Sequence, residues 1–159
     1  MKKFELTSES IVKFGKTLYR IRALVAFGDV KEGELGGFLE KEENLSQDGN
    51  AWVYGDAWVY GNARVYGDAR VCGDAIVFKT SHYLVIGPMG SRNGFTTFFR
   101  TKNLFIGVSC GCFRGNVDEF IKKVKETHGD NKYAKTYLAA AELAKMQIDL
   151  TPEENEPEE

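Results

Sequence analysis

Two arginine-containing loops of this 159-residue chain have the residue types of an anion-binding site. In the stretch GPMGSRNG, Ser91, Arg92 and Asn93 lie between glycines, which allow backbone N–H groups to converge on one point. Arg114 precedes Asn116, where a helix is expected to begin, and both an arginine fork and a helix N-terminus bind anions. If the two loops meet, they form a pocket suited to a phosphate or a nucleotide. The alternative is that both are ordinary glycine-rich turns.

Two of the three cysteines, Cys110 and Cys112, are separated by a single residue. On a β-strand this spacing puts both thiols on one face. A closed zinc site needs four ligands, and no second Cys or His pair has a suitable spacing, so no metal is expected. Two small buried side chains are the simpler interpretation, and a nucleophilic cysteine assisted by His128 is the alternative. An odd number of cysteines fits a reducing compartment.

The elements that must position these residues begin with a repeat of six residues, which runs from Gly49 to Phe78 as GNAWVYGDAWVYGNARVYGDARVCGDAIVF. Each unit contains Ala-X-Val, and alternation along a strand puts Ala and Val on one face and the middle residue on the other. The Gly with Asn or Asp that follows most units is typical of tight turns. Hexapeptide periods of this kind are typical of β-helices.

The repeat resembles that of left-handed β-helix hexapeptide-repeat proteins, in which three units make one triangular turn. The resemblance implies a mainly β fold with some α, in which residues 27–78 form a short left-handed parallel β-helix. Residues 18 apart would then stack about 4.8 Å from one another. The expected stacks are Arg70 on Trp52, Ile76 on Trp58 and Phe78 on Tyr60.

Many proteins of this family are trimeric acyltransferases that bind acyl-CoA between coils and use a histidine as general base. The five clean units contain no histidine and no inserted loop, and His82 is the nearest candidate base. An acyltransferase that uses acyl-CoA and His82 is therefore the alternative to a non-enzymatic protein without a cofactor.

Aromatic and arginine side chains project from the repeat. Alternation directs Trp52 and Trp58 outward, and tyrosines stand at the corners of the units. Because such residues are typical of interfaces, they are expected to form a contact surface in a homotrimer or for a partner, unless the C-terminal helices cover them. The expected surface consists of Trp52, Tyr54, Trp58, Tyr60, Arg64, Tyr66 and Arg70.

The flanking sequence predicts three further parts. Residues 1–26 contain one or two strands that cap the open end of the β-helix. Residues 79–150 form an α+β module, with strands at 83–86, 96–101 and 104–113 and helices at about 116–129 and 131–150. The tail 151–159 is acidic, contains two prolines and is expected to be disordered.

A second resemblance rests on the opening LYRIRALVAFGDVKEGELGGFLEKEENLSQDGNAWVYGDAWVYG, together with TTFFRTK, VSCGCFRG and ETHGDNKYAKTYL. These stretches are similar to phage- and prophage-borne proteins that join this repeat to a C-terminal module of β-strands and two helices. The resemblance covers roughly Phe4 to Leu150. It implies that the protein acts inside a bacterial cell.

Net charge and hydropathy indicate which classes of function the sequence does not favour. The chain has 21 basic and 23 acidic side chains. Without the five glutamates of its last nine residues, 21 basic and 18 acidic side chains remain, which gives a net charge of +3. This charge is too weak for a general nucleic-acid binder. No run approaches the roughly 18 apolar residues of a membrane span, and the first residues lack the apolar core of a signal peptide, so a cytoplasmic protein is expected.

The sequence therefore favours a non-enzymatic binding protein of phage type. The β-helix would serve as scaffold and oligomerisation element, and the C-terminal module would carry specificity. One form of this hypothesis is an inhibitor of a bacterial defence protein, and another is a protein that sequesters a nucleotide-like signal.

Overall fold

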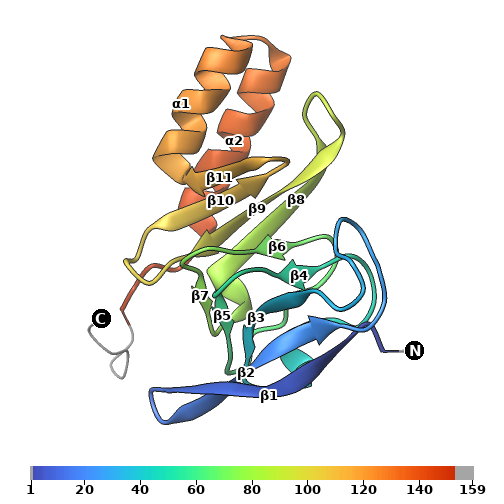
Figure 1. Cartoon of the computed structure of the whole chain (residues 1–159). Coiled ribbons are helices and arrows are strands. Elements are labelled where there is room, and N and C mark those ends of the chain that lie inside the picture. Colours follow the sequence, from blue (N-terminus) through green and yellow to red (C-terminus); the bar gives the residue numbers. More distant parts are fainter. Residues whose placement is uncertain (1, 153–159) are drawn as a thin grey trace.

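The computed structural model describes residues 2–152, and Figure 1 shows the elements in chain order. The strands are β1 (Phe4–Lys13), β2 (Lys16–Ala23), β3 (Leu35–Leu39), β4 (Trp52–Val53), β5 (Trp58–Val59), β6 (Arg70–Val71), β7 (Ile76–Val77), β8 (Tyr83–Met89), β9 (Gly94–Arg100), β10 (Ile106–Cys110) and β11 (Phe113–Asn116). The helices are α1 (Val117–His128) and α2 (Lys132–Gln147), with short 3-10 helices at Glu42–Asn44 and Thr80–His82. The predicted disordered tail lies outside the described residues from position 153 onward.

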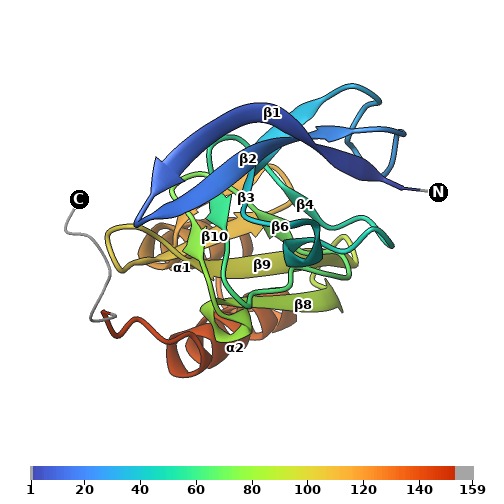
Figure 2. The same cartoon turned by 90° about the horizontal axis from the view of Figure 1, so that it is seen from below.

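The predicted fold class, a short left-handed parallel β-helix followed by an α+β module, is wrong. The strands form a five-stranded sheet in the order β1-β2-β3-β5-β7, a four-stranded sheet in the order β11-β10-β9-β8, and the pair β4-β6. The N-terminal hairpin β1–β2 is antiparallel and joins the repeat strands through β3, so it belongs to the same mixed sheet (Figure 2). Four of the five repeat triplets form strands of only two residues: β5 and β7 join the five-stranded mixed sheet, and β4 and β6 pair with each other. The third triplet makes only an isolated bridge, from Val65 to Leu45.

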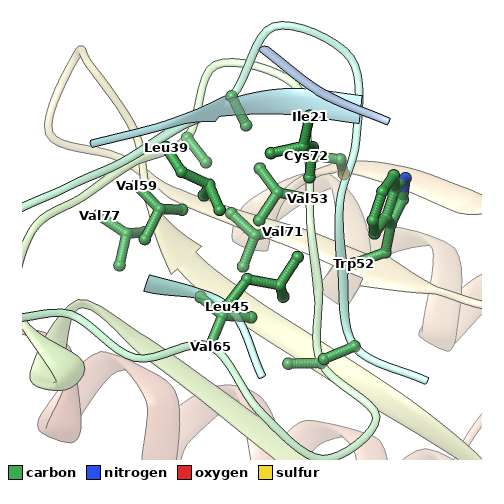
Figure 3. Packing of buried hydrophobic residues seen from close by; sticks show 14 of the residues in the cluster. Ile21, Leu39, Leu45, Trp52, Val53, Val59, Val65, Val71, Cys72 and Val77 are labelled. Carbon is green, nitrogen blue, oxygen red and sulfur yellow. The ribbon is translucent and has the colours of Figure 1, made fainter. Parts of the chain in front are cut away.

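Repeat units 18 residues apart nevertheless pair in parallel. The three expected stacks are present: Arg70 on Trp52, Ile76 on Trp58 and Phe78 on Tyr60. The valines of these units converge on a shared core, as Figure 3 shows. The fully buried members of this set are Val53, Val59, Val65, Val71 and Val77. Alternation thus places Ala and Val on the inner face of the repeat, as the sequence predicts.

Polar side chains complete the hydrogen bonding where a repeat strand has no neighbouring unit. The buried amide of Asn44 donates to the backbone oxygens of Gly61 at 3.2 Å and Ala63 at 2.9 Å. The ammonium of Lys3, a residue only 4% exposed, donates to the backbone oxygen of Ala51 at 2.8 Å. Because a buried carbonyl without a donor costs about 1–3 kcal/mol, these side chains stabilise the short strands.

Lys3 offers a test of this stabilisation. Burial lowers the pKa of its ammonium from 10.5 to about 8. Replacing Lys3 by methionine should lower the free energy of unfolding by about 1–2 kcal/mol at pH 7, because Ala51 and two neighbouring carbonyls lose their donor. Between about pH 8 and 10 the unfolded chain binds more protons at this lysine than the folded chain does. The free energy of unfolding of the wild type should therefore rise with pH relative to that of Lys3→Met.

Urea denaturation of both proteins across this pH range measures the effect. Lys2→Met is the matched control, because Lys2 is exposed and its ion pair with Glu42 is worth at most about 1 kcal/mol. A difference between the wild type and Lys3→Met that stays constant with pH would contradict the lowered pKa.

The four-stranded sheet separates the helices from the repeat (Figure 1). Phe98 of β9 is fully buried in a cluster with both helices, whereas its neighbour Phe99 joins the core of the repeat. A hydrogen bond of 2.9 Å from the backbone of Arg70 to the hydroxyl of Thr97 links β6 to β9. Both faces of β9 are therefore covered, and the domain boundaries predicted at residues 26, 78 and 150 stay predictions.

The two helices begin at the positions that the capping residues predict. Asn116 caps α1: its side chain accepts from the backbone of Glu119 at 2.8 Å, and the Glu119 carboxylate accepts from the backbone of Asn116 at 2.9 Å. Gly129 ends α1, and the side chain of Asn131 accepts from the backbone of Ala134 to begin α2. The second helix ends at Gln147, three residues earlier than predicted.

The strand predicted over residues 104–113 is wrong in its extent. It is divided into β10 and β11, which pair as an antiparallel hairpin. Gly111, with φ of +57°, lies in the turn between them, and this conformation favours glycine over residues with a side chain. Cys110 ends β10 and Cys112 lies exposed in the turn, so the two thiols do not share one face of a strand.

Candidate ligand-binding site

A cavity of about 250 Å³ opens between the β8–β9 hairpin, the turn from β10 to β11, and the two helices. Figure 1 shows how this hairpin projects beside α1 and α2. The polar side chains that line the cavity are Ser91, Arg92, Thr96, Lys123, Thr127 and His128. Its aromatic lining consists of Phe95, Phe113, Phe120 and Tyr137.

The hairpin tip is held against α2 by Tyr137. Its hydroxyl packs directly on Gly90, where φ is +79° and an added Cβ would collide with the phenol. Burial raises the pKa of Tyr137, with a smaller contribution from Cys110, and hydrogen bonds from Ser91 oppose this rise. The hydroxyl therefore stays protonated at neutral pH and can hold the tip in place. Asn93 lies at the same tip, with φ of +50°, but is not among the residues that line the cavity.

Two cationic side chains from separate elements line the cavity. Arg92 extends from the hairpin tip and Lys123 from α1, and both are exposed. His128, at the end of α1, stacks on Tyr137 with ring centroids 5.7 Å apart and an angle of 22° between the planes. Within the described part of the chain, no aspartate or glutamate lines this cavity. Its charge therefore favours an anion.

The wall of the cavity is largely aromatic. Phe95 borders the cavity, but alternation along β9 directs its ring away from the helix-facing Phe98, and the ring packs over Gly87 of β8. Phe113 is half-buried and packs on the buried Phe120, with ring centroids 5.6 Å apart. The half-buried ring of Phe113 beside cationic groups fits a ligand that has both an apolar body and a negative charge.

Two thiols also line the cavity. The half-buried Cys110 accepts a hydrogen bond from the hydroxyl of Thr96 at 3.2 Å, and Cys112 is exposed. His128 lines the same cavity, so a cysteine nucleophile assisted by this histidine stays a prediction. Among residues 2–152, no three His, Cys, Asp or Glu side chains are placed so that they could hold a metal ion.

Arg114 does not join Arg92 in one pocket. Its neighbour Phe113 packs on Phe120 beneath the helices. Alternation along β11 therefore turns Arg114 to the opposite face of the sheet, where it lines a separate groove beside Cys72. Of the anion-binding residues predicted from the sequence, Ser91 and Arg92 thus line the cavity, whereas Arg114 does not.

His82 is poorly placed to act as a general base. The residue is fully buried, and its Nδ1 accepts a hydrogen bond from the backbone of Phe78 at 3.2 Å. The imidazole also packs edge-on against the Phe78 ring, with centroids 4.5 Å apart. Since a general base must reach the group that it deprotonates, this placement does not favour the acyltransferase alternative.

The aromatic residues of the repeat are more covered than predicted. Trp52 points away from the inner valines (Figure 3). It is nevertheless fully buried, because Phe4 and Phe27 pack on its ring with centroids 6.3 Å and 5.3 Å away. Tyr60 is 6% exposed and packs against Phe14. The N-terminal hairpin and the loop after it provide this cover, whereas the sequence predicted an exposed contact surface, with the C-terminal helices as the alternative cover. Neither Trp52 nor Tyr60 contributes to an exposed surface.

The other residues of the predicted contact surface differ in exposure. Tyr54 and Arg70 are half-buried and share Asp29, which accepts from the Tyr54 hydroxyl at 2.8 Å and pairs with the Arg70 guanidinium at 3.1 Å. Trp58 is half-buried against the β1–β2 turn. The exposed members are Arg64 and Tyr66.

Sequence reasoning missed Lys123, Thr127, Phe95 and Tyr137 as cavity residues, and it named His128 only as the alternative partner of a nucleophilic cysteine. Lys123 and Thr127 are four residues apart on α1 and therefore share one face, beside the buried stripe. That spacing marks them as neighbours. Only the packing of α1 against the sheet shows that they face the hairpin tip.

Comparison of the sequence with models of protein families and with curated proteins finds no match. The resemblance to phage-borne hexapeptide-repeat proteins therefore stays a prediction. Within residues 2–152, no helix combines the length and the apolar character needed to cross a membrane.

Proposed function

We propose that this protein binds a small organic anion in the cavity between the β8–β9 hairpin and the two helices. One observation carries the proposal: Arg92 and Lys123, from different elements, lie at an aromatic-lined cavity to which no carboxylate contributes. A mainly apolar concavity with a few polar groups is the usual form of a small-molecule site. Arginine and lysine at its edge would select a negatively charged ligand.

Binding without catalysis accounts for the polar groups at this site. Tyr137 and Ser91 are engaged with each other, and His128 is stacked on Tyr137. The host-defence hypotheses, a trimeric assembly and the use of acyl-CoA stay predictions that this proposal does not require.

A thermal-unfolding screen with organic anions tests the proposal. The panel should contain nucleotides, aromatic carboxylates and alkyl carboxylates. An anion present at 100 times its Kd stabilises the folded chain by about 2.7 kcal/mol, which corresponds to a rise in Tm of roughly 5–10 °C for a protein of this size. We expect at least one class to produce this rise in the wild type.

Two variants should reduce the rise. Arg92→Gln removes a charge-assisted contact and should weaken binding by about tenfold. Gly94→Phe should obstruct the cavity, because Gly94 lines it and an added Cβ there meets no atom within 4 Å. Arg64→Gln, which removes an exposed arginine of the repeat, is the matched control and should bind as the wild type does. The proposal is wrong if no anion stabilises the protein, or if the rise persists in both pocket variants.

A further inference from the structure

We infer that the ligand of this cavity is a nucleoside monophosphate, an inference that rests on the proposed function. Its planar base would pack on the half-buried ring of Phe113, and its phosphate would lie between Arg92 and Lys123. The inference combines three properties of the cavity: its rings, its paired cations and its size.

The rings favour a flat ligand over a flexible chain. Phe113, at the start of β11, and Tyr137, on α2, present aromatic surface to the cavity. Aromatic side chains stack on bases of any sequence, because every base has a π-face. The exposed hydroxyl of Thr127 can donate and accept a hydrogen bond, as the mixed polar edge of a base requires.

The two cations favour phosphate over a single carboxylate. A guanidinium presents a planar fork that matches two phosphate oxygens, whereas an ammonium acts as a compact point charge. Arg92 and Lys123 extend from opposite sides of the cavity, the hairpin tip and α1, so they can contact different oxygens of one group. Their two positive charges match a phosphate that carries nearly two negative charges at neutral pH.

The volume limits the ligand to one base. At about 250 Å³ the cavity lies just below the range of roughly 300–1,000 Å³ that is usual for small-molecule sites. A dinucleotide or a coenzyme of similar size would therefore extend far into solvent.

Calorimetric titration of the full chain with parts of the ligand tests this assignment. The probes are adenosine 5′-monophosphate, guanosine 5′-monophosphate, adenosine, ribose 5-phosphate and sodium octanoate. At least one monophosphate should bind. Adenosine and ribose 5-phosphate should each bind at least about tenfold more weakly than that monophosphate, because each lacks half of the contacts. Octanoate should bind most weakly.

Matched variants locate the two halves of the ligand. Lys123→Gln should weaken the binding of the monophosphate and of ribose 5-phosphate by about tenfold but leave the binding of adenosine unchanged. The neighbouring Lys122→Gln should change the binding of none of the three. Phe113→Leu should weaken the binding of the monophosphate and of adenosine several-fold but leave the binding of ribose 5-phosphate unchanged. Phe105→Leu, at a phenylalanine that is 60% exposed outside the cavity, is its control.

The outcomes separate this inference from the proposed function. If octanoate or an aromatic carboxylate binds in a way that depends on Arg92 while both monophosphates fail, the inference is wrong and the anion site stands. If Phe113→Leu weakens the binding of ribose 5-phosphate as much as that of the monophosphate, the placement of the base is wrong. If none of the anions binds, both the inference and the proposed function are wrong.

Discussion

Replacing Trp52 with alanine should lower the free energy of unfolding by about 3–5 kcal/mol. The indole is fully buried between Phe4 and Phe27, and its ring fits there because Gly36 has no side chain. Its removal would leave a cavity between the N-terminal segment and the repeat, which the short surrounding strands cannot fill. Urea denaturation followed by circular dichroism measures the loss.

Trp58 provides the matched control, because it occupies the same position in the next repeat unit. It is only half-buried, against Phe14, so Trp58→Ala should cost about 1–2 kcal/mol. The Nε1 of Trp52 has no hydrogen-bond partner in the described chain, so Trp52→Phe should also cost much less than the alanine variant. Equal losses for Trp52→Ala and Trp58→Ala would contradict the packing described for the N-terminal segment.

Replacing Gly37 with alanine should lower the free energy of unfolding by about 3 kcal/mol. An added Cβ would lie 2.5 Å from the backbone oxygen of Ala57 and 2.7 Å from Cγ1 of Val53. The Ala57 oxygen cannot move away without loss of its hydrogen bond to the backbone of Phe38, which joins β3 to the repeat. Overpacking against a fixed backbone commonly costs about 1–3 kcal/mol, and here a hydrogen bond is lost as well.

Gly94→Ala is the control for this substitution. Gly94 also lies in a strand, but an added Cβ there meets no atom within 4 Å. The variant should unfold within about 0.5 kcal/mol of the wild type. A Gly37→Ala protein as stable as Gly94→Ala would show that β3 and the repeat are not packed as closely as described.

The repeat illustrates how far local patterns predict this fold. Alternation correctly assigns the buried positions Val53, Val59 and Val71, because the direction of a side chain follows from its own strand. The period also leads to the observed pairs, such as Trp52 with Arg70. The overall class is wrong, because two-residue strands are too short to determine which sheet they join. The antiparallel hairpin β1–β2, which no feature of the repeat encodes, decides that arrangement.

The candidate site was predictable only in part. Ser91 and Arg92 stand out in the sequence because glycines surround them, and both line the cavity. Lys123 lies on a helix with several other lysines, and only packing distinguishes it from Lys122. Arg114 resembles Arg92 in its local sequence, yet the register of β11 directs it to the other face of the sheet.

The sequence by itself determined the local features of this protein: the inner face of each repeat unit, the capped start of α1 at Asn116 and the end of that helix at Gly129. Each of these depends on neighbours within a few residues. The tertiary structure alone decided that Trp52 is buried, that His82 is inaccessible and that Arg92 and Lys123 meet at one cavity. These properties depend on segments far away in the chain, because exposure and charge clustering are set by whatever packs against a side chain rather than by its own strand or helix.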